Sequence, residues 1–299
     1  MDVIYIISFW LTSIISFNHP EEILFVGHAY GSPLISDKQI HPSLISFFNR
    51  YDFEHIKYII WGGDFILDCF DNKELENFKK FVPRNILDKS YYVLGNHEYR
   101  CFKDDKFIFN KIQENEILKF NNFNLLLANT NFKSYTDIDK LEEQIKKNSK
   151  NLILFTHQII FSKSNWLFRS NSRENYELAN DFYDRIKNIP LTIVSGDVGA
   201  FDKMPYQSFF KINNQKLLTS GVGNNDNNFI LSISVSNNDL KFHSINLKDL
   251  KKTPIIPNNY LLFTINNLFH YFFLSKKRSV VFVFCSLIFL FIISYKTSS

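Results

Sequence analysis

Side chains that can bind metal ions or transfer protons follow several apolar, strand-like runs of this 299-residue sequence. In the clearest case, the run YYVLG (residues 91–95) leads directly into Asn96, His97 and Glu98. The other cases are His28-Ala29-Tyr30 after residues 21–27, Asp64 after residues 55–63, His157 after residues 151–156 and Asp197 after residues 190–196. Ligands of α/β sheets bind beyond the carboxyl ends of the strands, so we expect the five segments to converge on one site.

Each segment taken alone has an ordinary structural explanation. Glycine followed by aspartate suits a turn, as at Gly63-Asp64. A single histidine at a strand end, such as His157, is more often a hydrogen-bonded structural residue. Gly95-Asn96-His97-Glu98 is more specific, because three consecutive side chains carry donor or acceptor atoms. The ordered set of five segments is a stronger indication of a site than any one of them.

Strand-like and helical patterns alternate along the chain and predict a layered α/β domain. We expect strands at 21–27, 55–64, 91–95, 116–130, 151–157 and 190–197, and helices at 41–51, 72–81, 136–148 and 172–188. Only strand-like patterns occur from residue 206 to residue 246. This last run predicts either a sheet that ends in antiparallel strands or a second sheet that packs on the first.

The order of the five segments resembles that of the calcineurin-like metallophosphoesterase family, and the resemblance covers residues 22–246. That family carries Asp-x-His, Gly-Asp, Gly-Asn-His-Asp/Glu, a single His and Gly-His-x-His in this order. The resemblance implies an α/β fold, a four-layer β-sandwich flanked by helices. It also implies two divalent metal ions (manganese, iron or zinc) at the strand ends, with a bridging hydroxide that attacks the phosphorus of a phosphoester.

The resemblance assigns roles to individual residues of this chain. Asp64 corresponds to the carboxylate that bridges both metal ions, and it is therefore a catalytic residue as well as a ligand. Asn96 and His157 correspond to ligands of the second ion. His97 corresponds to the catalytic histidine that protonates the leaving oxygen or stabilises charge on the phosphoryl group.

Two segments depart from the family pattern. His28-Ala29-Tyr30 replaces Asp-x-His, and Gly196-Asp197-Val198-Gly199 replaces Gly-His-x-His. His28 can still ligate a metal ion through a ring nitrogen, Asp197 through an oxygen, and Tyr30 as a phenolate. The second metal site therefore keeps Asp64, Asn96, His157 and Asp197. The first keeps Asp64, His28 and Tyr30, which leaves it one ligand short. The chain resembles a branch of the family that ends in Gly-Asp-Val-Gly.

Three further residues near these motifs have two interpretations each. Glu98 could orient His97 or lie on the surface, and the surface position is the favoured interpretation. Trp166 and Arg169, in the segment after His157, could contact the substrate, with Arg169 on a phosphate group. The other interpretation of that segment is an ordinary loop.

Both ends of the chain are apolar. Residues 279–295 contain no charged side chain and predict a C-terminal transmembrane helix. Lys276-Lys277-Arg278 slightly favours a cytoplasmic domain by the positive-inside rule. Residues 3–17 could be a signal sequence, a short anchor or a buried strand, and residues 258–275 could lie along the membrane interface. The expected organisation is an apolar N-terminal segment (1–20), a metallophosphoesterase domain (21–250), a juxtamembrane linker (251–278) and the transmembrane helix (279–295).

The charge of the chain argues against one class of partner, whereas its cysteines leave the cellular compartment open. The net charge of +4 is small, and no basic block suggests a nucleic-acid surface, so we expect no nucleic-acid partner. Of three cysteines, Cys285 lies in the apolar tail, and the pair Cys69 and Cys101 alone leaves the redox compartment open.

The sequence therefore predicts a metal-dependent phosphoester hydrolase with a single membrane anchor and a lipid- or glycan-linked substrate. One alternative is a pseudoenzyme of the same fold that acts as a binding protein, because its first metal site is incomplete. The other alternative is a non-enzymatic membrane protein with a binding domain.

Overall fold

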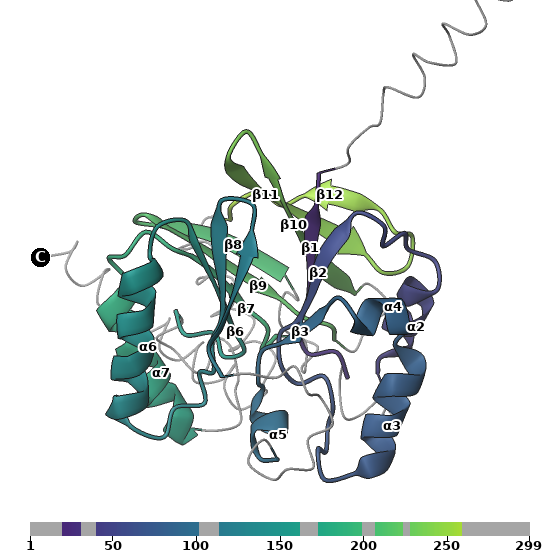
Figure 1. Ribbon diagram of the computed structural model, residues 1–299, viewed down its shortest axis with the longest axis horizontal. Coiled ribbons are helices and arrows are strands. Elements are labelled where there is room, and N and C mark those ends of the chain that lie inside the picture. Colours follow the sequence, from purple (N-terminus) through teal and green to yellow (C-terminus); the bar gives the residue numbers. More distant parts are fainter. Residues whose placement is uncertain are drawn as a thin grey trace, which may run out of the picture.

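The structure is a computed structural model, and it describes residues 20–30, 40–101, 114–161, 173–198, 207–223 and 228–258. Two mixed β-sheets form the centre of this part of the chain (Figure 1). The first sheet has the strand order β12-β11-β10-β1-β2-β3, and the second sheet has the order β4-β5-β6-β7-β9-β8.

The first sheet combines parallel and antiparallel strands. Strands β1, β2 and β3 run parallel to one another, whereas β10, β11 and β12 continue the sheet in antiparallel fashion. Its strands are β1 (Glu22–Val26), β2 (Ile56–Trp61), β3 (Ser90–Tyr92), β10 (Phe229–Ser236), β11 (Asp239–Asn246) and β12 (Lys252–Pro254).

The second sheet has a parallel centre and antiparallel edges. Strands β5, β6, β7 and β9 are parallel, and β4 and β8 pair antiparallel at the two edges. Its strands are β4 (Glu116–Phe120), β5 (Phe123–Leu127), β6 (Leu152–Thr156), β7 (Thr192–Ser195), β8 (Gln207–Ile212) and β9 (Gln215–Ser220). The two arrangements that the sequence left open, antiparallel ends and a second sheet, therefore both occur.

Helices cover the outer face of each sheet (Figure 1). They are α2 (Pro42–Phe48), α3 (Asn72–Phe81) and α4 (Arg84–Leu87) on the first sheet, and α6 (Tyr135–Asn148) and α7 (Arg173–Ile186) on the second. The short helix α5 (Asn96–Tyr99) lies instead beyond the end of β3 (Figure 1). One apolar cluster joins α2, α3 and α4 to the first sheet, and another joins α6 and α7 to the second sheet. A third cluster lies between the sheets and contains Phe25 of β1 stacked on Phe155 of β6. The four layers that the sequence predicted are therefore present.

The longer helices follow from local signals in the sequence. Helix α3 begins after Asp71, whose carboxylate accepts a hydrogen bond from the backbone N–H of Lys73 (2.9 Å), and it buries Leu75 and Phe78. Helix α6 begins at Tyr135, and the Asp137 carboxylate accepts from the backbone N–H of Ser134 (3.1 Å). Ser134 is therefore the N-cap residue, and Asp137, three residues into the helix, completes a capping box with it.

Some element boundaries differ from the prediction. Strand β3 ends at Tyr92, and the polar residues that follow Gly95 form the first turn of the short helix α5. The sequence patterns also missed α4 and β12. Strand β12 pairs with β11, so the first sheet extends beyond the predicted domain boundary at residue 250.

Both apolar ends, 3–17 and 279–295, lie outside the described residues. Across the ranges that the structure describes, no helix combines the length and the hydropathy that a membrane span requires.

A substitution at Trp61 of β2 would test the packing of the first sheet against its helices. Its side chain is fully buried among Phe48, Phe78 and Tyr92, and its indole N–H donates to the Ser90 hydroxyl (2.9 Å). We expect Trp61→Ala to lower the free energy of unfolding by about 3–5 kcal/mol in urea titrations, because it leaves a large cavity.

The control is Phe70→Ala, which also removes an aromatic ring but at a side chain that is 60% exposed. It should change the free energy of unfolding by less than about 0.5 kcal/mol. Similar losses in the two variants would contradict this assignment of the core.

Candidate metal centre

Glycines let the strand ends of the two sheets approach closely. Gly62 follows β2 of the first sheet and Gly196 follows β7 of the second sheet. A Cβ atom at Gly196 would lie 2.1 Å from the Gly62 carbonyl oxygen, and one at Gly27, after β1, would lie 2.7 Å from Gly196 Cα. No side chain fits at these contacts, so glycine is required where the sheets meet.

Asp64 lies where these strand ends meet and is 3% exposed. Its Oδ1 atom is 3.4 Å from His157 Nε2, and its Oδ2 atom is 3.7 Å from His28 Nε2 and 3.8 Å from His97 Nε2. Burial opposes ionisation of Asp64, but the three histidines outweigh burial and hold its pKa below the ordinary value. Asp64 is therefore an anion with histidine nitrogens on both oxygen atoms.

His157 is fully buried and has a fixed orientation. Its Nδ1 atom donates to the Gly62 carbonyl oxygen (3.0 Å), so Nε2 is the atom that faces the centre. Nε2 lies 3.1 Å from Asn96 Oδ1 and 3.9 Å from Asp197 Oδ1. Burial lowers the pKa of His157, but Asp64 and Asp197 raise it above the ordinary value. Metal-binding histidines commonly have this arrangement, with the second nitrogen bound to a carbonyl oxygen.

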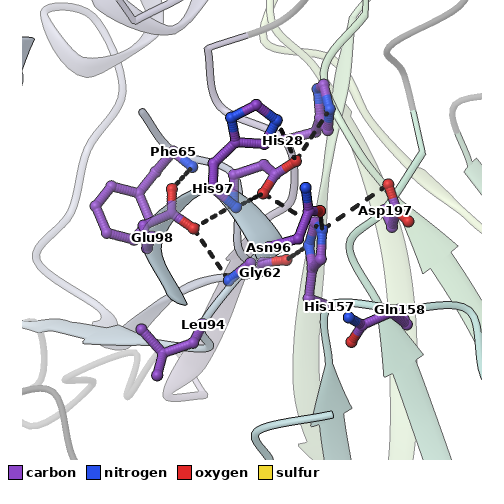
Figure 2. Close-up of polar contacts among 12 residues, drawn as sticks. His28, Gly62, Phe65, Leu94, Asn96, His97, Glu98, His157, Gln158 and Asp197 are labelled. Atoms are coloured by element: carbon purple, nitrogen blue, oxygen red, sulfur yellow. Dashed lines mark hydrogen bonds and ion pairs between the residues drawn. The ribbon is translucent and has the colours of Figure 1, made fainter. Parts of the chain in front are cut away.

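His28, Asp64 and Asp197 offer three ligand atoms within 4.8 Å of one another. Figure 2 shows His28, Asn96, His157 and Asp197 gathered in one place. His28 is 1% exposed, and burial lowers its pKa, so it is a neutral imidazole. Its Nδ1 atom has no hydrogen-bond partner among the described residues. One neutral imidazole and two carboxylates whose ligand atoms lie this close together fit a divalent metal ion.

Tyr30 and His97 lie together beside this group. The Tyr30 hydroxyl is 3.5 Å from His97 Nε2, and the Tyr30 ring also packs against the ring of His28. Burial and the Asp64 charge raise the pKa of Tyr30, so its side chain is a neutral phenol at neutral pH. The predicted phenolate ligand therefore requires that a metal ion displace the Tyr30 proton.

The structure brings together every site residue that the sequence predicted. These are His28, Tyr30, Asp64, Asn96, His97, His157 and Asp197. Their individual roles stay predictions. Trp166, Arg169 and Gly199 lie outside the described residues.

The expected surface position of Glu98 is wrong. Its side chain is fully buried and accepts four backbone N–H groups. Oε1 accepts from Phe65 (2.8 Å) and Ile66 (3.1 Å), and Oε2 accepts from Asp64 and Gly95 (3.0 Å each). Burial and the nearby Asp64 charge raise the pKa of Glu98 to about 7. The motif gives no sign of this role, because three of the four donors (Asp64, Phe65 and Ile66) lie far from Glu98 in the sequence.

A second buried glutamate continues this support. Glu74 of α3 accepts from the backbone N–H groups of Leu67 (2.9 Å) and Asp68 (2.8 Å) through Oε2. Two carboxylates thus accept all five consecutive N–H groups of residues 64–68. We call residues 64–68 the Asp64 loop. A disulfide between Cys69 and Cys101 joins the end of this loop to the residues that follow α5.

Glu98→Gln tests this support. The amide group would place its own hydrogens against two backbone N–H donors, and each buried donor without an acceptor costs about 1–3 kcal/mol. We expect a loss of roughly 2–4 kcal/mol of unfolding free energy in urea titrations, together with weaker binding of manganese ions.

The matched control is Glu54→Gln, the same chemical change at an exposed residue. It should leave both quantities unchanged. Equal stability and equal manganese affinity for Glu98→Gln and the wild type would exclude the proposed support of the Asp64 loop.

Comparisons with known proteins identify the fold but not a close relative. No family model matches the sequence, and neither does any protein of curated function. Among solved structures, GAP50, described as the anchor in the inner membrane complex of Plasmodium, is 13% identical with a TM-score of 0.53. The match covers 84% of this chain and 93% of GAP50.

Vps29 from Entamoeba histolytica, solved with zinc, is 13% identical with a TM-score of 0.39, and the match covers 78% of this chain and 96% of Vps29. At these identities the similarity concerns the fold alone. The chain thus has the calcineurin-like metallophosphoesterase fold.

Proposed function

We propose that this protein is a metal-dependent phosphoester hydrolase. The observation that carries the proposal is the convergence of His28, Asp64 and Asp197 within 4.8 Å at the carboxyl ends of strands from both sheets. His157 and Asn96 border the same group. Nitrogen and oxygen ligands in this mixture suit manganese, iron or zinc.

Two metal ions would account for the whole set of ligands, with Asp64 available to both. We assign Asp64, Asn96, His157 and Asp197 to one ion, and Asp64 with His28 to the other. Tyr30 would complete the second set only as a phenolate, which burial disfavours. When bound, the ions would supply Lewis acidity that polarises a phosphoryl oxygen and makes a water molecule more acidic.

His97 is suited to handle the proton of the leaving group. Its Nδ1 atom contacts the Leu67 carbonyl oxygen, and Nε2 lies 3.8 Å from Asp64 Oδ2. Nδ1 is held between the Leu67 carbonyl oxygen and Arg100 Nη2 (3.0 Å), so Nε2 is the atom left to face the substrate. Nε2–H is then available to protonate the leaving oxygen of the ester.

The alternative is a binding protein of the same fold. GAP50 is described as an anchor, and the ligand set around His28 is smaller than that around His157. Under this alternative the metal ions would have a structural role, and phosphoesters would not be hydrolysed.

The deciding experiment is hydrolysis of an aryl phosphodiester and an aryl phosphomonoester by the purified full-length protein. It would be run with manganese, zinc or iron, beside Asp64→Asn and the surface control Asp52→Asn. We expect metal-dependent turnover that falls at least roughly 100-fold in Asp64→Asn and is unchanged in Asp52→Asn. Metal binding without turnover of either ester would favour the binding protein.

We further propose that the protein is held at a membrane by residues 279–295 and acts on a lipid- or glycan-linked phosphoester. The Cys69–Cys101 disulfide supports a domain that faces an oxidising compartment, because such bonds rarely persist in the cytosol. This proposal replaces the cytoplasmic side that Lys276-Lys277-Arg278 slightly favoured.

Thiol counting in cells with a secretory pathway tests the side of the membrane. The full chain would be denatured in acid and labelled with a maleimide-polymer before and after reduction. We expect one labelled cysteine before reduction, Cys285, and three after it. Three labelled cysteines without reduction would place the domain in a reducing compartment.

A further inference from the structure

Buried polar side chains join the two sheets beside the candidate metal centre. Asn131 Nδ2 donates to the Leu94 carbonyl oxygen (2.9 Å), and Leu94 stands shortly before Asn96 in the chain. Asn131 Oδ1 accepts from Gln158 Nε2 (2.9 Å), and Gln158 directly follows His157. A single side chain therefore connects the segments that carry Asn96 and His157.

The neighbours of Asn131 fix its orientation. Asn131 is 4% exposed and Gln158 is 2% exposed. Asn131 Nδ2 also donates to Asn129 Oδ1 (3.0 Å), and Gln158 Oε1 accepts from the Thr130 hydroxyl. If the Asn131 amide were rotated by 180°, its NH₂ group would face a donor and its oxygen would face two acceptors. Only one orientation satisfies these contacts.

The Leu94 carbonyl explains why a polar residue is needed at position 131. Strand β3 is the edge of the first sheet and ends at Tyr92, so the buried Leu94 lies beyond the strand pairing. A buried carbonyl without a donor costs about 1–3 kcal/mol, and Asn131 supplies that donor from the loop between β5 and α6. The contact joins the edge of the first sheet to the loop that follows β5 of the second sheet.

We propose that Asn131 is a positioning residue of the metal centre. It sets the separation between Asn96, which follows β3 of the first sheet, and His157, which follows β6 of the second sheet. The inference rests on the proposed function only in that both residues are taken as metal ligands. Removing hydrogen bonds that orient metal ligands weakens metal affinity by about 10–100-fold.

The test is Asn131→Asp in the full-length protein. Aspartate can still accept from Gln158, but it cannot donate to Leu94 and sets a negative charge against that carbonyl oxygen. Manganese titration by calorimetry should show affinity reduced by about 10–100-fold relative to the wild type.

Gln215→Glu is the matched control. Gln215 is 2% exposed and donates to the carbonyl oxygens of Ile186 (3.0 Å) and Ile189 (2.9 Å) at the opposite end of the second sheet. Both variants replace a buried amide that donates to backbone carbonyls by a carboxylate. Both should therefore lower the melting temperature, but Gln215→Glu should keep manganese affinity within about twofold, since it lies away from the ligands. Equal losses of affinity in the two variants, or wild-type affinity in Asn131→Asp, would overturn the inference.

Asn131→Ala covers the case in which the aspartate variant does not fold. Without metal, we expect faster amide hydrogen exchange in the peptide that contains α5, with unchanged exchange in β6 and β7. Unchanged exchange in the α5 peptide would overturn the inference. Neither manganese titration nor hydrogen exchange needs an active enzyme. If the protein binds manganese but hydrolyses no phosphoester, the proposed function is refuted, and the role of Asn131 can still be tested.

Discussion

The arrangement of the site depends on two buried carboxylates that accept the backbone N–H groups of the Asp64 loop. Glu98 accepts from Asp64, Phe65 and Ile66, and Glu74 accepts from Leu67 and Asp68. Residues 64–66 of this loop are buried, so their three N–H groups need acceptors within the protein, and Glu98 supplies them. Asp64 also has a positive φ of 52°, which costs energy for a residue with a side chain. The two carboxylates stabilise this backbone conformation and so fix the direction of the central aspartate.

The negative charges of Glu98 and Asp64 oppose each other, so the support that Glu98 gives to the Asp64 loop depends on the positive groups around Asp64. Glu98 and Asp64 are both buried acids, and their proximity raises the pKa of Glu98 to about 7. The surrounding histidines act in the opposite direction on Asp64, and they hold its pKa down. A divalent ion held by Asp64 would add to the effect of the histidines. The support of the loop and the proposed binding of metal therefore stabilise each other, although Glu98 faces away from the ligands and toward the backbone.

The sequence predicted the residues that gather at the centre better than the residues that hold them there. Asp64, His157 and Asp197 follow parallel strands, and the carboxyl ends of such strands meet at one edge, so their convergence followed from strand order. Glu98 was assigned to the surface because burial depends on the distant loop that covers it. Asn131 gave no signal at all, since an asparagine before a helix is an ordinary loop residue. The pairing of Cys69 with Cys101 likewise depends on how α5 packs against the Asp64 loop, which spacing alone does not determine.

The departures from the family pattern change the charge of the site, and the charge bears on the substrate. His28 is a neutral imidazole in a position where the family has an aspartate, and Tyr30 is a neutral phenol. Among the ligands assigned above, only Asp64 and Asp197 carry negative charge. Two divalent ions would bring four positive charges against these two, which leaves a net charge of about +2 before substrate binds. Under the proposed function, an excess of this size in a buried site would stabilise a dianion more than a monoanion, so a phosphomonoester would be the better substrate.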